Sequence, residues 1–237
     1  MCRLLAFNTR ENVDIKILKI FSNVAEKDFL SSTLSHSDGW GISTYIYNNS
    51  WKNLFYKSKD PIYKDTFYES ISGLLNGEKI IGLVHARKAG KKFLHGVTHS
   101  HPYHLKVKNY ELYFAHNGSV SRKAFQNPLL PYTDSFLILL EISKEIENGY
   151  SPLDAYNIVF NRLKPFSTSL NSVLLTFNEA EGPKIYVGYY YNKERLKEIE
   201  EYYKLYRFKD YVFSSTLKFY FDNDIEELIY GDIITLE

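Results

Sequence analysis

Short apolar runs alternate along the chain with amphipathic stretches. Residues 3–8 are apolar on both alternating faces, which is typical of a strand buried on both sides. Over residues 13–30, apolar side chains such as Val13, Ile17 and Phe21 recur at helical spacing, which predicts an amphipathic helix. Further apolar strands are predicted after Gly41 and at residues 79–85, 111–115, 172–177, 185–190, 211–213 and 233–236.

Turn and capping residues divide the rest of the chain. Asn48-Asn49-Ser50 predicts a tight turn that leads into a second strand from Trp51, which together form a hairpin. Asp60-Pro61 predicts the start of a helix that ends near Gly77. Helices are also predicted at residues 133–148, 151–163 and 193–206.

The grouping of these elements predicts the class of fold. Strands cluster together and helices follow in pairs, which favours an α+β fold of stacked sheets covered by helices. We find no internal repeat, low-complexity tract or linker, so the sequence predicts one domain over residues 1–237.

Composition narrows the class of function. The 237 residues carry a net charge of +1, and no dense cationic run suggests nucleic-acid binding. No apolar run approaches the ~20 residues that cross a bilayer, and the N-terminus does not resemble a signal peptide. The single cysteine excludes a disulfide within the chain and is consistent with a reducing compartment. We therefore expect a cytoplasmic protein that does not act on membranes or nucleic acid.

Cys2 is the residue around which we expect the chemistry to be organised. If Met1 is removed, Cys2 carries a thiol and a free α-amine, whose pKa values are normally about 8.5 and about 8. An unprotonated amine can accept the thiol proton, as in other N-terminal nucleophiles. The alternative is that Cys2 is a small buried apolar residue, as most free cysteines are.

Five stretches are more polar and richer in glycine than their flanking strands require. Each stretch has a structural explanation: Asn117-Gly118 is typical of a hairpin turn, Asp134 of a helix cap and Arg87 of a surface cation. His85 and His116 would then be hydrogen-bonded histidines near strand ends. The stretches are residues 36–41, 85–90, 98–103, 116–119 and 133–135.

Taken together, six motifs resemble a known family. In order they are Met-Cys-Arg-Leu-Leu-Ala-Phe, Asp-Gly-Trp-Gly, Val-His-Ala-Arg, His-Ser-His-Pro-Tyr, Phe-Ala-His-Asn-Gly and Thr-Asp-Ser, and they extend from Met1 to Ser135. This series resembles the class II glutamine amidotransferases, which are N-terminal-nucleophile hydrolases, and is most similar to their small stand-alone branch. The resemblance implies a four-layer αββα sandwich of two mainly antiparallel sheets.

The resemblance also implies roles for individual residues. Cys2 would attack the γ-glutamyl amide, and Asn117 and Gly118 would donate hydrogen bonds to the oxyanion. Arg87 would bind the substrate α-carboxylate, for which a planar guanidinium is suited, and Asp134 the α-ammonium. We also expect His101 and Gly90 to line the substrate site. Two departures from the family pattern are Phe136, where an acid is frequent, and Gly90, where Thr or Ser is frequent.

The sequence leaves several functions open. We expect hydrolysis of a γ-glutamyl amide through a Cys2 thioester. The alternatives are a glutaminase subunit that supplies ammonia to a separate synthase, and an inactive protein that binds γ-glutamyl compounds or acts as a scaffold. The sequence also leaves a homo-oligomer open.

The histidine-rich stretch also suggests a metal site. His99, His101 and His104 could bind zinc, although Tyr103 stands where a metal-binding aspartate would be needed. We expect neither a metal nor a cofactor.

Overall fold

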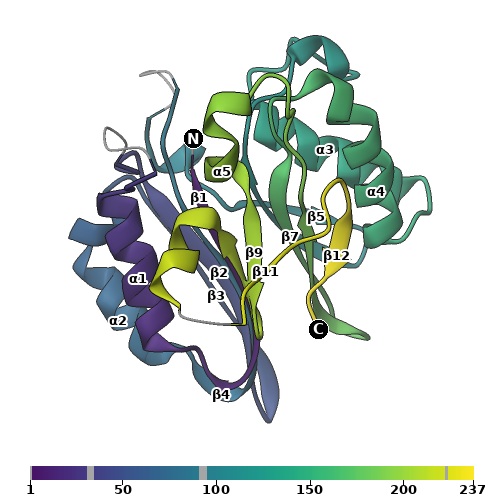
Figure 1. Cartoon of the computed structure of the whole chain (residues 1–237). Coiled ribbons are helices and arrows are strands. Elements are labelled where there is room, and N and C mark those ends of the chain that lie inside the picture. Colours follow the sequence, from purple (N-terminus) through teal and green to yellow (C-terminus); the bar gives the residue numbers. More distant parts are fainter. Residues whose placement is uncertain (1, 31–34, 91–94, 222–223) are drawn as a thin grey trace.

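Two antiparallel sheets form the centre of the molecule (Figure 1). The computed structural model describes residues 2–30, 35–90, 95–221 and 224–237. The larger sheet has the order β11-β9-β10-β1-β4-β2-β3, made of β1 (Arg3–Asn12), β2 (Trp40–Asn48), β3 (Ser50–Ser58), β4 (Asn76–Ala86), β9 (Leu205–Phe208), β10 (Tyr211–Ser214) and β11 (Glu226–Glu227). The smaller sheet has the order β12-β8-β7-β6-β5, made of β5 (Tyr103–Val107), β6 (Tyr110–Asn117), β7 (Asn171–Asn178), β8 (Gly182–Gly188) and β12 (Ile233–Thr235).

Helices cover the outer face of each sheet. In Figure 1, α1 (Ile15–Glu26) and α2 (Thr66–Leu74) lie against the larger sheet, and α3 (Asp134–Glu147) and α4 (Pro152–Leu163) lie against the smaller one. Three apolar cores fill the spaces between these layers, one between the two sheets and one beneath each helix pair. The predicted four-layer αββα sandwich is therefore confirmed.

The alternation along β1 shows how the sequence produces these layers. Leu4 and Ala6 pack in the core between the sheets, whereas Leu5 and Phe7 pack in the core under α1 and α2. All four side chains are at most 2% exposed. Complete burial of a Leu or Phe side chain contributes about 1.5–3 kcal/mol, which is why a central strand has no polar face.

Most of the predicted turns and helix caps are confirmed. Asn49, in the left-handed region with φ of 62°, joins β2 to β3, whose residues pair from Trp40–Ser58 to Asn48–Ser50. The Thr133 hydroxyl accepts from the Phe136 N–H at the start of α3, and Gly149 follows its end with φ of 107°. Ser151 caps α4 in the same way, with Pro152 in its first turn.

Three predicted helices differ from the structure, two of them substantially. The helix predicted from Asp60-Pro61 is divided into a 3₁₀ turn at Ile62–Lys64 and α2, whose cap is Asp65, and Gly77 lies inside β4 rather than at a helix end. The helix predicted at residues 193–206 is wrong for most of its length. Only a 3₁₀ turn at Lys197–Ile199 and the short α5 (Glu200–Tyr203) are helical there.

The C-terminal part of that segment becomes β9 because β10 and β11 pair with it on both sides. Tertiary pairing thus overrides the helical preference of a charged sequence. The helix predicted at residues 13–30 is also shorter than expected, since α1 ends at Glu26. Within the described parts of the chain, no helix has the length and apolar character needed to cross a membrane.

Candidate active site

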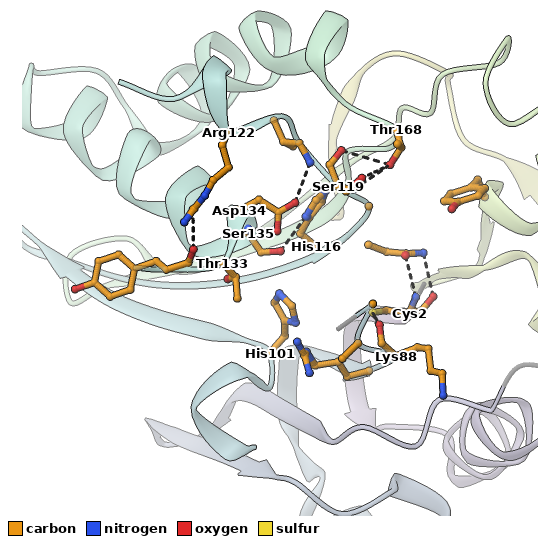
Figure 2. A pocket seen from close by; sticks show the side chains of 18 residues that line it. Cys2, Lys88, His101, His116, Ser119, Arg122, Thr133, Asp134, Ser135 and Thr168 are labelled. Carbon is orange, nitrogen blue, oxygen red and sulfur yellow. Dashed lines mark hydrogen bonds between the residues drawn. The ribbon is translucent and has the colours of Figure 1, made fainter. Parts of the chain in front are cut away.

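Cys2 lies immediately before β1, on the side that faces the smaller sheet. Its side chain and backbone are only 7% exposed. The Cys2 backbone N–H donates to Asn117 Oδ1 at 2.9 Å, and Asn117 Nδ2 donates to the Cys2 carbonyl at 2.9 Å. The backbone N–H of Lys88 donates to Cys2 Sγ at 3.4 Å. The residue is therefore held across the two sheets by a reciprocal pair of hydrogen bonds, with a donor directed at its sulfur (Figure 2).

A cavity of about 500 Å³ opens beside Cys2. The structure brings into its wall every residue that the sequence selected for the site, although these residues come from distant parts of the chain. They are Cys2, Arg87, Gly90, His101, Asn117, Gly118 and Asp134. Figure 2 shows Cys2 and His101 on one side of the cavity and Asp134 across from them.

The Asp-Gly-Trp-Gly motif positions the loop that carries Arg87. The Asp38 N–H donates to the Arg87 carbonyl at 3.0 Å, and the Arg87 N–H donates to the Gly39 carbonyl at 2.8 Å. The Asp38 carboxylate also accepts from the Ala89 N–H at 2.8 Å. The hydrogen bonds with Asp38 and Gly39 therefore fix the backbone of this loop.

The two glycines of the same motif allow the loop that carries His101 to cross the end of β2. A Cβ atom at Gly39 would lie 2.3 Å from Ser100 Oγ, and one at Gly41 would lie 2.3 Å from the His101 carbonyl oxygen. Ser100 Oγ donates to the Ser58 carbonyl at 2.8 Å and fastens this loop to β3. Side chains at either glycine would displace His101 from the cavity.

Asn117 and Gly118 do not form the hairpin turn that their sequence would otherwise indicate. Asn117 ends β6 and pairs with Asn171 of β7, and Gly118 follows as a bend with a positive φ of 159°. Glycine is required here by space, because a Cβ atom at Gly118 would lie 2.0 Å from the Ser169 carbonyl oxygen.

We expect Gly118→Ala to lower the free energy of unfolding by at least about 2 kcal/mol, because overpacking against fixed backbone forces the strand ends apart. Chemical denaturation measures the change. Gly73→Ala is the control: it lies in α2 with no atom within 4 Å of the added Cβ, and alanine there should be neutral or stabilising. Equal stability of the Gly118→Ala variant and the wild type would contradict the close packing.

Asp134 is the first residue of α3, and its carboxylate faces the cavity. Asp134 Oδ2 accepts from the Val120 N–H at 2.8 Å, and Oδ1 accepts from the Ser135 N–H at 2.9 Å. The helix cap is Thr133 and not Asp134, so the carboxylate is left directed toward the cavity. A negative charge in the first turn of a helix is favoured by the helix dipole.

Burial favours the neutral form of the histidines beside the cavity. His116 Nε2 donates to the Ser169 carbonyl at 2.9 Å, and Nδ1 accepts from the Ser135 hydroxyl at 3.0 Å, so His116 is the hydrogen-bonded histidine that the sequence suggested. Burial lowers its pKa. Burial also holds the pKa values of His85 and His101 well below the usual range, with the nearby Arg87 charge acting in the same direction.

His85 differs from the expected hydrogen-bonded histidine. Its ring and that of His101 lie 4.3 Å apart, and neither ring nitrogen of either residue has a hydrogen-bond partner in the part of the chain that the structure describes. The structure does not assemble the alternative zinc site either. His104 pairs with Glu111 at 2.6 Å, and no group of three or more His, Cys, Asp or Glu side chains in the described ranges could hold a metal ion.

Sequence analysis missed a buried charged cluster behind Cys2. Arg3 is completely buried, forms an ion pair with Asp28, and donates to the Tyr202 carbonyl at 3.0 Å and to Thr216 Oγ1 at 2.8 Å. His36 Nε2 lies 3.2 Å from the same carboxylate. Burial lowers the pKa of His36 to about 4, so it donates as a neutral imidazole. Only an arginine within an apolar strand hinted at this cluster.

Comparisons with known proteins add to this geometry. The family model described as "Glutamine amidotransferases class-II" matches residues 1–213. A search of curated proteins finds no match. Among solved structures, the chain is similar to a glutamine aminotransferase class-II domain protein from Silicibacter pomeroyi, with 15% identity and a TM-score of 0.52, covering 99% of this chain and 94% of that one.

Two further structures show the same fold. A predicted glutamine amidotransferase from Pseudomonas aeruginosa has 13% identity and a TM-score of 0.52, with coverage of 99% of this chain and 92% of that one. The allosteric regulatory enzyme of purine biosynthesis has 13% identity and a TM-score of 0.59, and the match covers 99% of this chain but 46% of that one.

Proposed function

Because the chain belongs to the class II glutamine amidotransferases, whose fold is of the N-terminal-nucleophile hydrolase type, we propose that it cleaves a γ-glutamyl amide through a thioester on Cys2. The products would be glutamate and ammonia or an amine. The observation that carries this proposal is the convergence of Cys2, Arg87, Asn117, Gly118 and Asp134 on one cavity. We further propose that residues 1–237 form one such domain.

Activation of the thiol needs a base and a stabilised thiolate. The α-amine of Cys2, once Met1 is removed, is the base closest to the sulfur, and its pKa is normally within ~1 unit of that of the thiol. The Lys88 N–H donates to Sγ at 3.4 Å, where it would also contact the thiolate. Met1 itself lies outside the described residues.

Attack on the amide carbon forms a tetrahedral intermediate with a negative oxygen. One hydrogen of the Asn117 NH₂ group is used by the Cys2 carbonyl, and the second is available for this oxygen. The Gly118 N–H would be the other donor. The ammonium of Cys2 then protonates the leaving nitrogen, and water hydrolyses the thioester to release glutamate.

The cavity contains groups of both charges that the α-groups of an amino acid require. Arg87, directly after β4, and Asp134, the first residue of α3, both line it. The guanidinium would bind the α-carboxylate of a γ-glutamyl group, and the carboxylate its α-ammonium. The side-chain amide then points toward Cys2.

The test is release of glutamate from glutamine and from a panel of γ-glutamyl amides. We expect turnover only from protein whose Met1 has been removed, as established by intact mass, because an acylated nitrogen cannot accept the thiol proton. Protein expressed with an additional N-terminal residue that resists removal should be at least about a hundredfold slower. Full activity with Met1 in place would rule out the amine as base, and no turnover of any γ-glutamyl compound would rule out the proposed hydrolysis.

A further inference from the structure

Tyr203 is a tyrosine of the cavity wall that comes from a segment outside the family motifs. It lies in α5, is only 5% exposed and lines the cavity with Cys2. Its carbonyl accepts from Asn171 Nδ2 at 2.5 Å. Its hydroxyl has no hydrogen-bond partner among the described residues and, unlike that of Tyr202, is not a fully buried unpartnered atom, so it remains accessible to a ligand.

The position of this side chain is fixed by its neighbours. Tyr202 stacks on the buried Arg3, with the guanidinium carbon 3.6 Å from the ring centroid, and its own ring lies 5.4 Å from that of Tyr203. Burial raises the pKa of Tyr203 to about 12, and the nearby Cys2 acts in the same direction. The phenol therefore stays protonated and can donate a hydrogen bond.

Under the proposed function, Arg87 and Asp134 would hold the α-groups, and Cys2, Asn117 and Gly118 the reacting carbonyl. Several other polar side chains of the cavity wall already have partners within the protein: Arg122 donates to two carbonyls, Thr133 to the Tyr103 hydroxyl and Ser135 to His116, and Lys88 pairs with Asp38. The wall also includes the hydroxyl residues Ser119, Thr168 and Tyr203, which we call the hydroxyl wall. Within it, the Ser119 and Thr168 hydroxyls bond to each other at 3.1 Å. Of these three hydroxyls, only that of Tyr203 has no partner in the described part of the chain.

We propose, resting on the hydrolysis proposed above, that the hydroxyl wall binds the leaving group and that Tyr203 donates to an acceptor on it. The preferred substrate is then a γ-glutamyl amide whose amine carries a carboxylate or carbonyl group, and not glutamine. A cavity of about 500 Å³ lies within the range of ~300–1,000 Å³ that encloses ligands larger than a single amino acid. Water adds to the thioester, and the products are glutamate and the substituted amine.

The experiment compares glutamine, γ-glutamyl-ethylamide and γ-glutamyl-glycine. For the wild type we expect the highest kcat/KM with γ-glutamyl-glycine. Tyr203→Phe removes only the hydroxyl and should lower kcat/KM for γ-glutamyl-glycine about tenfold, as for one lost hydrogen bond, while the values for the other two compounds stay within about twofold.

Tyr202→Phe is the matched control. It removes the hydroxyl of the adjacent tyrosine, which is buried and has no hydrogen-bond partner within the described ranges. Tyr202 is not among the residues that line the cavity, so all three kcat/KM values should be unchanged. An equal effect of Tyr203→Phe on the three compounds, or no effect, would overturn the proposal about the leaving group while leaving the hydrolysis intact.

A binding measurement keeps the two proposals separate if no compound turns over. Calorimetric titration of the Cys2→Ser variant should show about tenfold tighter binding of γ-glutamyl-glycine than of glutamine, and Tyr203→Phe in that background should abolish the difference. Equal affinities would overturn the role of the hydroxyl wall independently of catalysis.

Discussion

Cys2→Ser should fold and bind a γ-glutamyl substrate but turn it over at least about a hundredfold more slowly, a barrier increase of ~2.7 kcal/mol or more. The substitution keeps the α-amine and nearly keeps the size of the side chain. The amine can deprotonate a thiol whose pKa is close to its own, but not an alcohol, whose pKa is far higher. The measurement is turnover together with a melting curve for both proteins.

Cys2→Ala provides the control for this prediction. It removes the nucleophile altogether, and its residual rate defines the background against which the serine variant is judged. If Cys2 were only a small buried residue, both variants would keep a near-normal rate with a small change in stability. Equal rates at equal stability would contradict the catalytic role of Cys2 and with it the proposed function.

Asn117→Ala should lower kcat by roughly a hundredfold to a thousandfold, equivalent to ~2.7–4 kcal/mol, because one donor to the oxyanion is lost. The same change removes both hydrogen bonds to the Cys2 backbone, each 2.9 Å long, so the nucleophile also loses its fixed position. Steady-state kinetics separates kcat from KM, and the kcat value should be corrected for the folded fraction.

Two comparison variants make the result specific. Asn178→Ala also removes a buried amide at a strand end, where it accepts from the Ala180 and Glu181 N–H groups, but it lies at the opposite end of β7 and should change stability and not kcat. Arg87→Ala should mainly raise KM, since its contact is shared by ground and transition states. A raised KM for Asn117→Ala with a reduced kcat for Arg87→Ala would show that the two roles are exchanged.

Much of this arrangement could be predicted from sequence where the signal is local. The apolar faces of β1 placed it in the middle of the sandwich, and Thr133 and Ser151 fixed the starts of α3 and α4. Most of the residues selected from motifs line one cavity because they lie at or beside strand ends: Cys2 precedes β1, Arg87 follows β4, His101 precedes β5 and Asn117 ends β6. Strand ends of the two sheets meet at the same edge of the molecule (Figure 1).

The parts that could not be predicted depend on contacts between distant segments. Thr216 Oγ1 donates to Asp28 Oδ1 at 2.7 Å across 188 positions of sequence, and no local pattern marks Asp28 as the partner of Arg3. The position of Tyr203 in the cavity could not be predicted either, because its segment was predicted to be one long charged helix. Pairing of β9 with its neighbours shortens that helix to α5 and thereby places Tyr203 in the cavity.

The two hydrogen bonds between Cys2 and Asn117 have a consequence for how the molecule tolerates change. They join residues beside β1 and β6, which belong to different sheets, so the distance between the nucleophile and its oxyanion donors is set by the thickness of the apolar layer between them. That layer acts as a spacer as well as a core. Substitutions that change side-chain volume in the cores beneath the outer helices should lower only the stability of the protein. The same change in volume in the core between the sheets should also alter the alignment of the reacting atoms.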